Sequence, residues 1–166
     1  MWRAINGVLA LALLSNPATG QPPAETAPVP SQILTAKKIF ISNAPGEVSD
    51  IYPPERLYSQ FYAAVKSWGQ YELVSAPGDA DLVFEVSFIN PIVGVSGGVS
   101  ISDPQFRLVI LDPETHVSLW WLTAHVQPAN LRGSRIRNFD QAVAGLKAQA
   151  KQLISRPANT SNDTRK

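Results

Sequence analysis

The sequence predicts a two-layer α+β sandwich, with one mixed sheet of about five strands and two helices packed on one of its faces. Two stretches place apolar residues at helical spacing, and several short stretches are rich in β-branched and aromatic residues. Along the chain they follow the order β-α-β-β-β-β-α. The formal net charge of +1 argues against nucleic-acid binding, and the lack of cysteine excludes disulfides and thiolate chemistry.

Both ends of the chain are expected to lie outside this domain. Arg3 precedes a short apolar run from Val8 to Leu14, and small residues follow at 18–20, as in a secretory signal peptide. The run is too short to stay as a membrane anchor, so no transmembrane segment is expected after cleavage, and the destination is the periplasm or the exterior. The expected organisation is a signal peptide over residues 1–20, a proline-rich linker over 21–36, a single domain over 37–156 and a disordered tail over 157–166.

The first half of the domain is expected to hold three strands and a helix. Residues 38–41 favour a strand, and apolar side chains recur every three or four residues over 57–68, which predicts a helix that ends at Gly69. A second strand is expected at 71–73. Residues 82–89 alternate strictly, which predicts a half-buried third strand.

A hairpin is expected after the glycine-containing stretch 91–103, with a turn at 112–115 that has proline in its second position. Side chains alternate between the two faces of each strand. Loops of two or four residues give the two strands the same relative parity, so both predict the same core face. The residues expected on that face are Phe106, Leu108, Ile110, Val117, Leu119 and Trp121.

The last helix is expected to begin at Asn138, which could cap it together with Gln141, and to end before Pro157. Its apolar positions recur at helical spacing and predict one buried stripe. The residues of this stripe are Phe139, Ala142, Val143, Leu146, Ala150 and Leu153.

Several of these segments resemble bacterial cell-envelope accessory proteins of unknown function. The segments are the strand at 38–41, the helix at 57–68, residues 80–86, and residues 108–115 leading into Leu119-Trp120. They look like an "A-D-hydrophobic" strand and a "D-x-x-T-G…L-W" hairpin, with His116 in place of the glycine. The arrangement is also similar to the amino-terminal domain of the Tol-system translocation protein and to curli-secretion-type lipoproteins, although this chain lacks the lipidated cysteine. The resemblance implies an accessory or assembly module of the envelope rather than a catalyst.

Two adjacent tryptophans indicate a candidate binding surface. Neighbouring strand residues point to opposite faces, so burial of Trp121 would leave Trp120 on the face without helices. An exposed aromatic and aliphatic patch is typical of a partner surface, unless the 91–104 loop or a terminal segment folds over it. The residues expected in this partner-binding patch are Trp120, Leu122, Arg107, Val109 and Leu111.

A second candidate is an anion-binding site just before the last helix. Arg132, Arg135 and Arg137 surround Gly133-Ser134. Their guanidinium groups could hold a phosphate or carboxylate polymer beside the helix N-terminus through bidentate hydrogen bonds. The alternative is a solvated loop.

A third candidate is a catalytic serine. Residues 94–98 fit the G-x-S-x-G nucleophile pattern around Ser96, but no helical pattern follows them. A flexible loop or a bent hairpin extension, with glycine at positive φ, is the simpler interpretation. The same stretch lacks the Gly-Lys-Ser/Thr ending of a phosphate loop, which argues against nucleotide binding by that route. No cofactor is expected.

Carboxylates and histidines provide two further candidate sites. Asp81 with Glu85, or Asp112 with Glu114, could form a carboxylate pair for glycoside hydrolysis, but sheet-edge and turn roles are simpler. Two histidines an odd number of residues apart on one strand point to opposite faces, which argues against a shared metal. The two are His116, expected in the turn at positive φ, and His125.

These observations predict an exported, non-enzymatic module that binds another envelope protein or polymer without a cofactor. Two alternatives stay open. One is a small envelope hydrolase that uses Ser96 or a carboxylate pair. The other is a structural protein that self-associates into a homo-oligomer through an edge strand.

Overall fold

The structure is a computed structural model that describes residues 27–47 and 49–155. The expected signal peptide, the start of the linker and the expected tail lie outside the described residues. No helix in the described ranges is long and apolar enough to cross a membrane. The elements are α1 (Ser31–Thr35), β1 (Lys38–Asn43), α2 (Pro54–Trp68), β2 (Glu72–Leu73), the 3-10 helix η1 (Pro77–Asp79), β3 (Leu82–Ile89), β4 (Ile92–Ser96), β5 (Val99–Ser102), β6 (Gln105–Leu111), β7 (Ser118–His125) and α3 (Arg132–Ile154).

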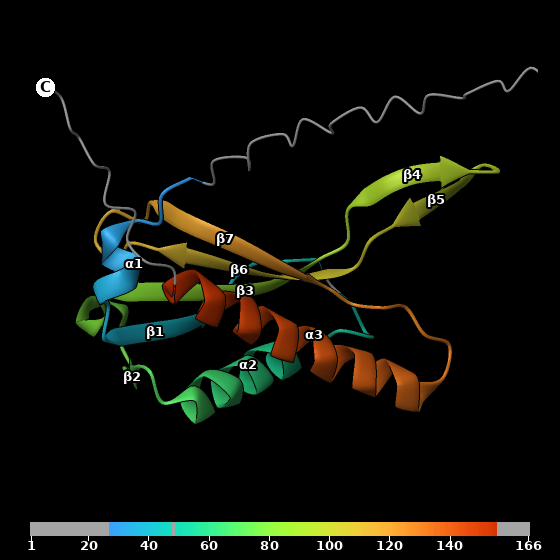
Figure 1. The fold of residues 1–166 in the computed structure, drawn as a ribbon. Helices are drawn as coiled ribbons and strands as arrows, with labels where there is room; N and C mark the ends of the chain where they lie inside the picture. The colour runs from blue at the N-terminus through green and yellow to red at the C-terminus, as the bar shows by residue number, and fades with distance from the viewer. Residues whose placement is uncertain (1–26, 48, 156–166) are drawn as a thin grey trace, which may run out of the picture.

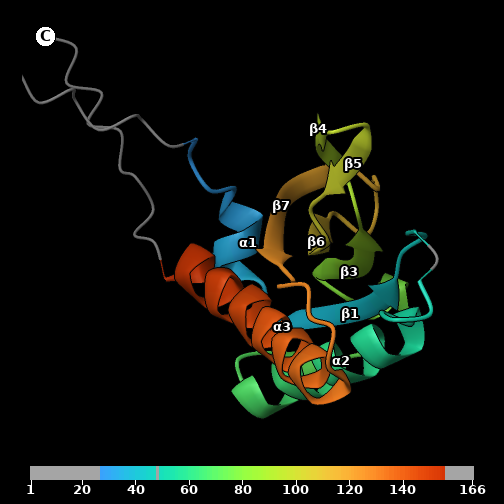
Figure 2. The same ribbon diagram turned by 90° about the vertical axis from the view of Figure 1, so that its right-hand side faces the viewer.

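The predicted two-layer sandwich is confirmed. Five strands form one mixed sheet in the order β2-β1-β3-β6-β7. Strand β1 runs parallel to both of its neighbours, whereas β6 is antiparallel to β3 and β7. Helices α2 and α3 pack against each other and cover one face of the sheet (Figure 1). The opposite side, called the outer face below, has no helix from the described part of the chain over it (Figure 2).

The core lies between the sheet and these two helices. Phe84 and Leu108 are fully buried on the inward side of the sheet, in one cluster with Phe61 of α2 and Phe139 of α3. The rings of Phe106 and Phe139 meet edge to face, with 4.7 Å between their centroids. Each large apolar side chain buried in this way contributes about 1.5–3 kcal/mol, so this cluster is the main source of stability.

Strand β3 is more buried than expected. Its alternation predicts one buried face, but Val83 and Ser87 on the outer face are also buried. The strand is the centre of the sheet, and the chain that follows β1 lies directly against it. A Cβ atom on Gly46 would lie 2.6 Å from the carbonyl oxygen of Phe88 and 3.1 Å from Cβ of Ser87, so only glycine fits this close approach.

The folded domain begins earlier than expected, since residues 31–36 are not an extended linker. Residues 31–35 form α1, and Ile33 is fully buried in the core. Gln32 donates from Nε2 to Oδ2 of Asp112 at 2.8 Å and to the carbonyl oxygen of Asp81 at 3.2 Å. The Asp81 carboxylate accepts the two backbone N–H groups that lead into β1, at 2.8 and 2.9 Å. These contacts hold α1 against the body.

The predicted core face of the return strand is wrong. Trp120 pairs with Ile110 and Leu122 pairs with Leu108, so both side chains lie on the helix side, packed against the core. Trp121 stands opposite Val109 on the outer face and is 60% exposed. The inward and outward sets of β7 are therefore exchanged.

A β-bulge causes this exchange. The turn has the four-residue form, closed by the Asp112 N–H that donates to the carbonyl of Val117 at 3.0 Å, and His116 has the expected positive φ, at 57°. The first pair after it, Leu111 with Ser118, has the register that this loop predicts. The register then shifts by one residue, which places Leu119 in the bulge and turns every later side chain to the other face. Val117, expected in the core, precedes the strand and is exposed.

The last helix begins earlier than expected. Helix α3 starts at Arg132, after Leu131, which makes no side-chain cap. Asn138 is inside the helix, and its Nδ2 donates to the carbonyl oxygen of Gln127 at 2.7 Å. The predicted buried stripe from Phe139 to Leu153 is confirmed. The apolar period begins only at Phe139, which explains why the polar first turns were missed.

The glycine-containing stretch forms a hairpin of its own. Strands β4 and β5 make a separate two-stranded sheet, joined by Gly97 and Gly98, which have φ values of 58° and 79°. The hairpin projects beyond the end of the main sheet and away from α2 and α3 (Figures 1 and 2). The interpretation as a bent hairpin extension is confirmed.

Candidate functional site

The hairpin carries an apolar surface that is open to solvent. Its strands alternate aliphatic residues with serine or glycine, and no charged residue occurs from Pro91 to Ser102. Val95 lies on the face of Ser100, whereas Val99 and Ile101 lie on the opposite face, so both faces of the hairpin expose aliphatic side chains. Exposed apolar surface of this kind marks contact sites in soluble proteins. The residues of this hairpin surface, each between 48% and 69% exposed, are Ile92, Val93, Val95, Val99 and Ile101.

The hairpin strands pair only with each other among the described strands. Each therefore has one edge whose backbone N–H and C=O groups are open to another strand. A two-stranded hairpin alone is marginally stable in water. Association with another molecule could therefore stabilise the hairpin in two ways, by burying its aliphatic side chains and by pairing the backbone groups of its open edges.

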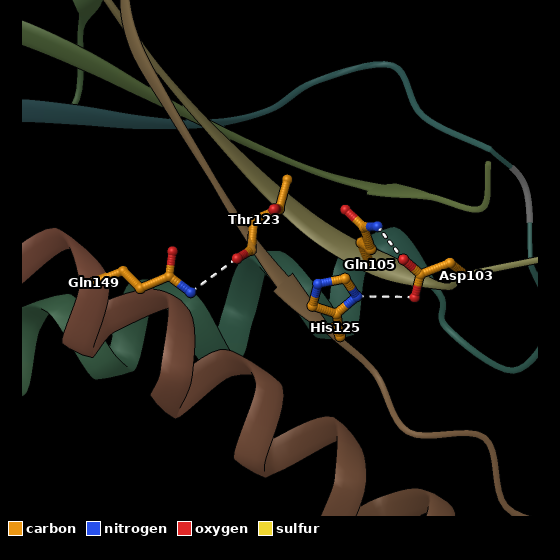
Figure 3. Close-up of polar contacts among 5 residues, drawn as sticks. All are labelled: Asp103, Gln105, Thr123, His125 and Gln149. Atoms are coloured by element: carbon orange, nitrogen blue, oxygen red, sulfur yellow. Dashed lines mark hydrogen bonds and ion pairs between the residues drawn. The ribbon is translucent and has the colours of Figure 1, made fainter. Parts of the chain in front are cut away.

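The base of the hairpin is tied to the body through Asp103, which directly follows β5 (Figure 3). Its Oδ1 lies 2.8 Å from Nδ1 of His125 on β7, and its other oxygen accepts a hydrogen bond from Gln105. Its backbone N–H donates to the carbonyl of Pro91 at 3.0 Å, which closes the base. The hydrogen bond with His125, and to a smaller extent the one with Gln105, lower the pKa of Asp103 below its ordinary value of 3.8.

The outer face carries a second, smaller apolar surface. Arg107, Val109 and Leu111 lie on this face as expected, and the exposed indole among them is that of Trp121. Trp120 and Leu122, predicted as part of the patch, instead line a small hollow of about 130 Å³ against α3, together with Gln149, Gln152 and Leu153.

The edge of β7 is partly covered by α3. Nε2 of Gln149 donates to the carbonyl oxygen of Thr123 at 2.8 Å (Figure 3). This bond occupies one backbone acceptor on the outer edge of the sheet. The bulge near Leu119 interrupts the ladder at the other end of the same strand.

The three predicted arginines lie in the first turns of α3, not in a loop. Arg132 and Arg135 line a surface hollow of about 380 Å³. Arg137 is not among its lining residues, and it donates to Oγ of Ser134 at 3.0 Å. The hollow also contains Asp50, Ile51, Arg56 and Ile136.

Arg56, which the sequence did not single out, is the third arginine of this hollow. Its guanidinium lies 4.1 Å above the ring of Phe139 and forms an ion pair with Asp140 at 3.2 Å. One carboxylate therefore already neutralises one of the three charges, and Asp50 provides a second nearby.

The candidate nucleophile and its partners lie in different parts of the molecule. Ser96 precedes the turn of the projecting hairpin, and a strand follows that turn rather than a helix. Asp112 lies in the turn after β6, at the far end of that strand from the hairpin. The nucleophile-elbow geometry that the G-x-S-x-G pattern requires is absent from these described segments.

The candidate carboxylates hold backbone in place. Asp112 Oδ1 accepts the N–H groups of Glu114 and Thr115 at 2.9 and 2.8 Å. The hydrogen bond from the Thr115 backbone, followed by that from the Gln32 side chain, lowers the pKa of Asp112 from 3.8 to about 2. Backbone hydrogen bonds from the start of β1 lower the pKa of Asp81 in the same way. A cluster of three or more potential metal ligands is not found within the described ranges.

No protein-family model matches the chain, and no curated protein matches it. Solved structures with a similar arrangement include a PelC dodecamer from Paraburkholderia phytofirmans, at 12% identity over 69% of this chain and 87% of that one, with a TM-score of 0.48. A protein from Xanthomonas campestris assigned to the family model DUF330 is similar at 11% identity over 78% and 88%, with a TM-score of 0.46. A lipoprotein from Neisseria meningitidis is similar at 14% identity over 70% and 99%, with a TM-score of 0.41. The similar structures thus include proteins of unknown function and bacterial lipoproteins, whereas the expected similarity to the Tol and curli proteins stays a prediction.

The hairpin surface is the feature that sequence reasoning passed over as a simple extension. The signal was present in the sequence. Two short runs of alternating β-branched residues flank Gly97-Gly98, which is a strong two-residue hairpin signal, and no charge interrupts them. A hairpin without charged side chains on either face has an apolar surface wherever it projects from the body.

Proposed function

We propose that this protein is an exported, non-enzymatic assembly module of the cell envelope, which binds a protein partner through the hairpin surface. The observation that carries the proposal is the projecting, uncharged hairpin with five exposed aliphatic side chains. Export rests on the signal-peptide pattern of residues 1–20.

The chemistry of the hairpin favours a protein partner over a charged polymer. Between Pro91 and Ser102 the side chains offer only aliphatic groups and serine hydroxyls. Such a surface gains free energy by burying apolar area and by pairing backbone groups, and both come from another polypeptide. The apolar surface around Trp121 provides a further, smaller contact on the outer face.

Site-specific photo-crosslinking in intact cells tests this proposal. A photoreactive residue placed at Val95, on the hairpin, should give a covalent adduct with a protein. The same residue at Glu55, exposed on α2, serves as the matched control and should give none. Adducts at neither position, or equal adducts at both, would reject the hairpin as the binding surface.

A further inference from the structure

We infer that the partner of the hairpin is a second copy of this chain, joined by antiparallel pairing of β5 with β5 around a two-fold axis at Ser100. The inference rests on the proposed function and names its partner. This pairing would convert two separate two-stranded hairpins into one four-stranded sheet between the copies.

Charge favours a second copy over other occupants. The hairpin has no charged side chain to complement a charged partner, and the whole chain has a formal net charge of only +1, so two copies repel each other weakly. The hairpin also lacks the tryptophan, tyrosine, lysine and arginine that anchor a segment at a lipid surface. Its best complement is another uncharged strand with aliphatic side chains.

Strand β5 provides the more regular edge of the hairpin. Strand β4 contains Gly94, and its pairing with β5 is irregular between Ile92 and Gly94. Strand β5 has no glycine and no bulge, and its residues from Val99 to Ser102 alternate aliphatic and serine side chains. Bulges and glycines disrupt strand pairing, so β5 is the edge on which a new ladder forms with least distortion.

The hydrogen-bonding pattern of the hairpin selects the register. Ser96 and Val99 flank the two-residue turn and form its closing pair, so the backbone groups of Ser100 point away from β4. Pairing Ser100 with Ser100 of the second copy satisfies these groups on both chains. The same register places Val99 opposite Ile101 of the second copy, and it does so twice because of the symmetry.

The neighbouring register is less favourable. A shift to the next position with the same hydrogen-bonding parity would centre the pairing on Ile101 and place Val99 opposite Asp103 of the second copy. That carboxylate is already engaged by His125 and Gln105. Ser100 at the axis therefore gives two aliphatic cross-strand pairs and leaves the base of each hairpin intact.

A cysteine placed at the axis tests this geometry directly, because the native chain contains none. In a Ser100→Cys variant the two cysteines would face each other with Cα atoms about 5.5 Å apart, within the range of a disulfide. In the matched control, Ser102→Cys, the same residue type on the same exposed strand lies roughly 13 Å from its counterpart. Protein purified from cells that express the full chain is oxidised and analysed by non-reducing electrophoresis.

The expected result is a covalent dimer from Ser100→Cys and a dimer yield at least about tenfold lower from Ser102→Cys. Cysteines whose Cα atoms lie more than about 7 Å apart cannot form a disulfide without backbone movement. Sedimentation equilibrium provides a second measurement. Val99→Lys should weaken self-association by about tenfold or more, whereas Val117→Lys, at a residue of similar exposure on the body, should not.

Three outcomes would overturn the inference: a monomer at every concentration, no disulfide from Ser100→Cys, or equal disulfide yields from both cysteines. The photo-crosslinks from Val95 separate this failure from that of the proposed function. If Val95 crosslinks to a different protein, the proposed function stands and the pairing of two copies is rejected. If Val95 crosslinks neither to a second copy nor to another protein, both the proposed function and the pairing are rejected.

Discussion

Strand β7 and strand β5 both lie at a sheet edge, but the rest of the molecule treats them in opposite ways. On β7, a bulge interrupts the ladder near Leu119, and Gln149 of α3 occupies the carbonyl of Thr123. On β5, the described chain provides no covering helix and the sequence places no charge on the strand. Edge strands invite pairing with other chains, and proteins block those that should not pair. The contrast shows which edge is protected and which is available.

The same contrast holds for side-chain burial. Inward residues of β6, such as Phe106, are fully buried, while the aliphatic residues of the hairpin are largely exposed. Stability of the isolated chain therefore resides in the sandwich, and the hairpin can change without affecting it. The following predictions test this division, beginning with the largest expected effect.

Phe106→Ala should lower the free energy of unfolding by about 3–5 kcal/mol, because it leaves a cavity beside Phe139 in the core. Val95→Ala on the hairpin should change it by less than about 0.5 kcal/mol. Urea unfolding of dilute protein, followed by circular dichroism, measures both. A cost for Val95→Ala close to that of Phe106→Ala would show that the hairpin packs on the body, which would break the comparison.

Gln149→Leu should lower the free energy of unfolding by about 1 kcal/mol, since the carbonyl of Thr123 loses its hydrogen bond. The variant also uncovers part of the β7 edge, so it should associate at lower protein concentration in light scattering. Gln152→Leu, on the next turn of α3, adds the same apolar group and serves as the control. Equal behaviour of the two variants would mean that Gln149 does not protect the edge.

Asp112→Asn tests the end of the sheet opposite the hairpin. The pKa of Asp112 is lowered from 3.8 to about 2 in the folded protein, so its contribution is complete above pH 3.8 and is lost as the pH falls toward 2. The variant should therefore show a smaller loss of stability between pH 4 and about pH 2 than the parent. Urea midpoints measured across this range give the result, and parallel curves for the two proteins would contradict it.

Local patterns were sufficient to predict most of the fold. The alternation over 82–89 and the helical spacing over 57–68 predict β3 and α2, and the glycine at 69 ends that helix at a φ of 70°. Each of these signals depends only on residues that are close together in the sequence, so it can be recognised without the structure. The order of the elements then restricts the fold to one sheet with helices on one face.

The predictions that the structure contradicts are those that depend on contacts between residues far apart in the sequence. Ile33 is buried because α1 packs against the core, and Gln32 beside it bonds Asp112 and Asp81, which are far away in the sequence. The bulge at Leu119 has no signal in the hydrophobic pattern, because both tryptophans suit either face. For the candidate site, Arg107, Val109 and Leu111 were placed on the correct face, but the tryptophan among them was the wrong one of the pair.

The bulge in β7 also determines which kind of sequence change can remodel this protein. Parity in a strand is discrete, so the side chains beyond the bulge lie on one face or the other as a set. Deletion of Leu119 would remove the extra residue and leave Trp120 opposite Ile110 and Trp121 opposite Val109, whereas loss of the bulge at constant length would exchange the faces of every residue from Trp120 to His125. A homologous chain of the same length without the bulge would therefore present the other set of side chains to solvent, and a comparison of residue identities column by column would overlook it.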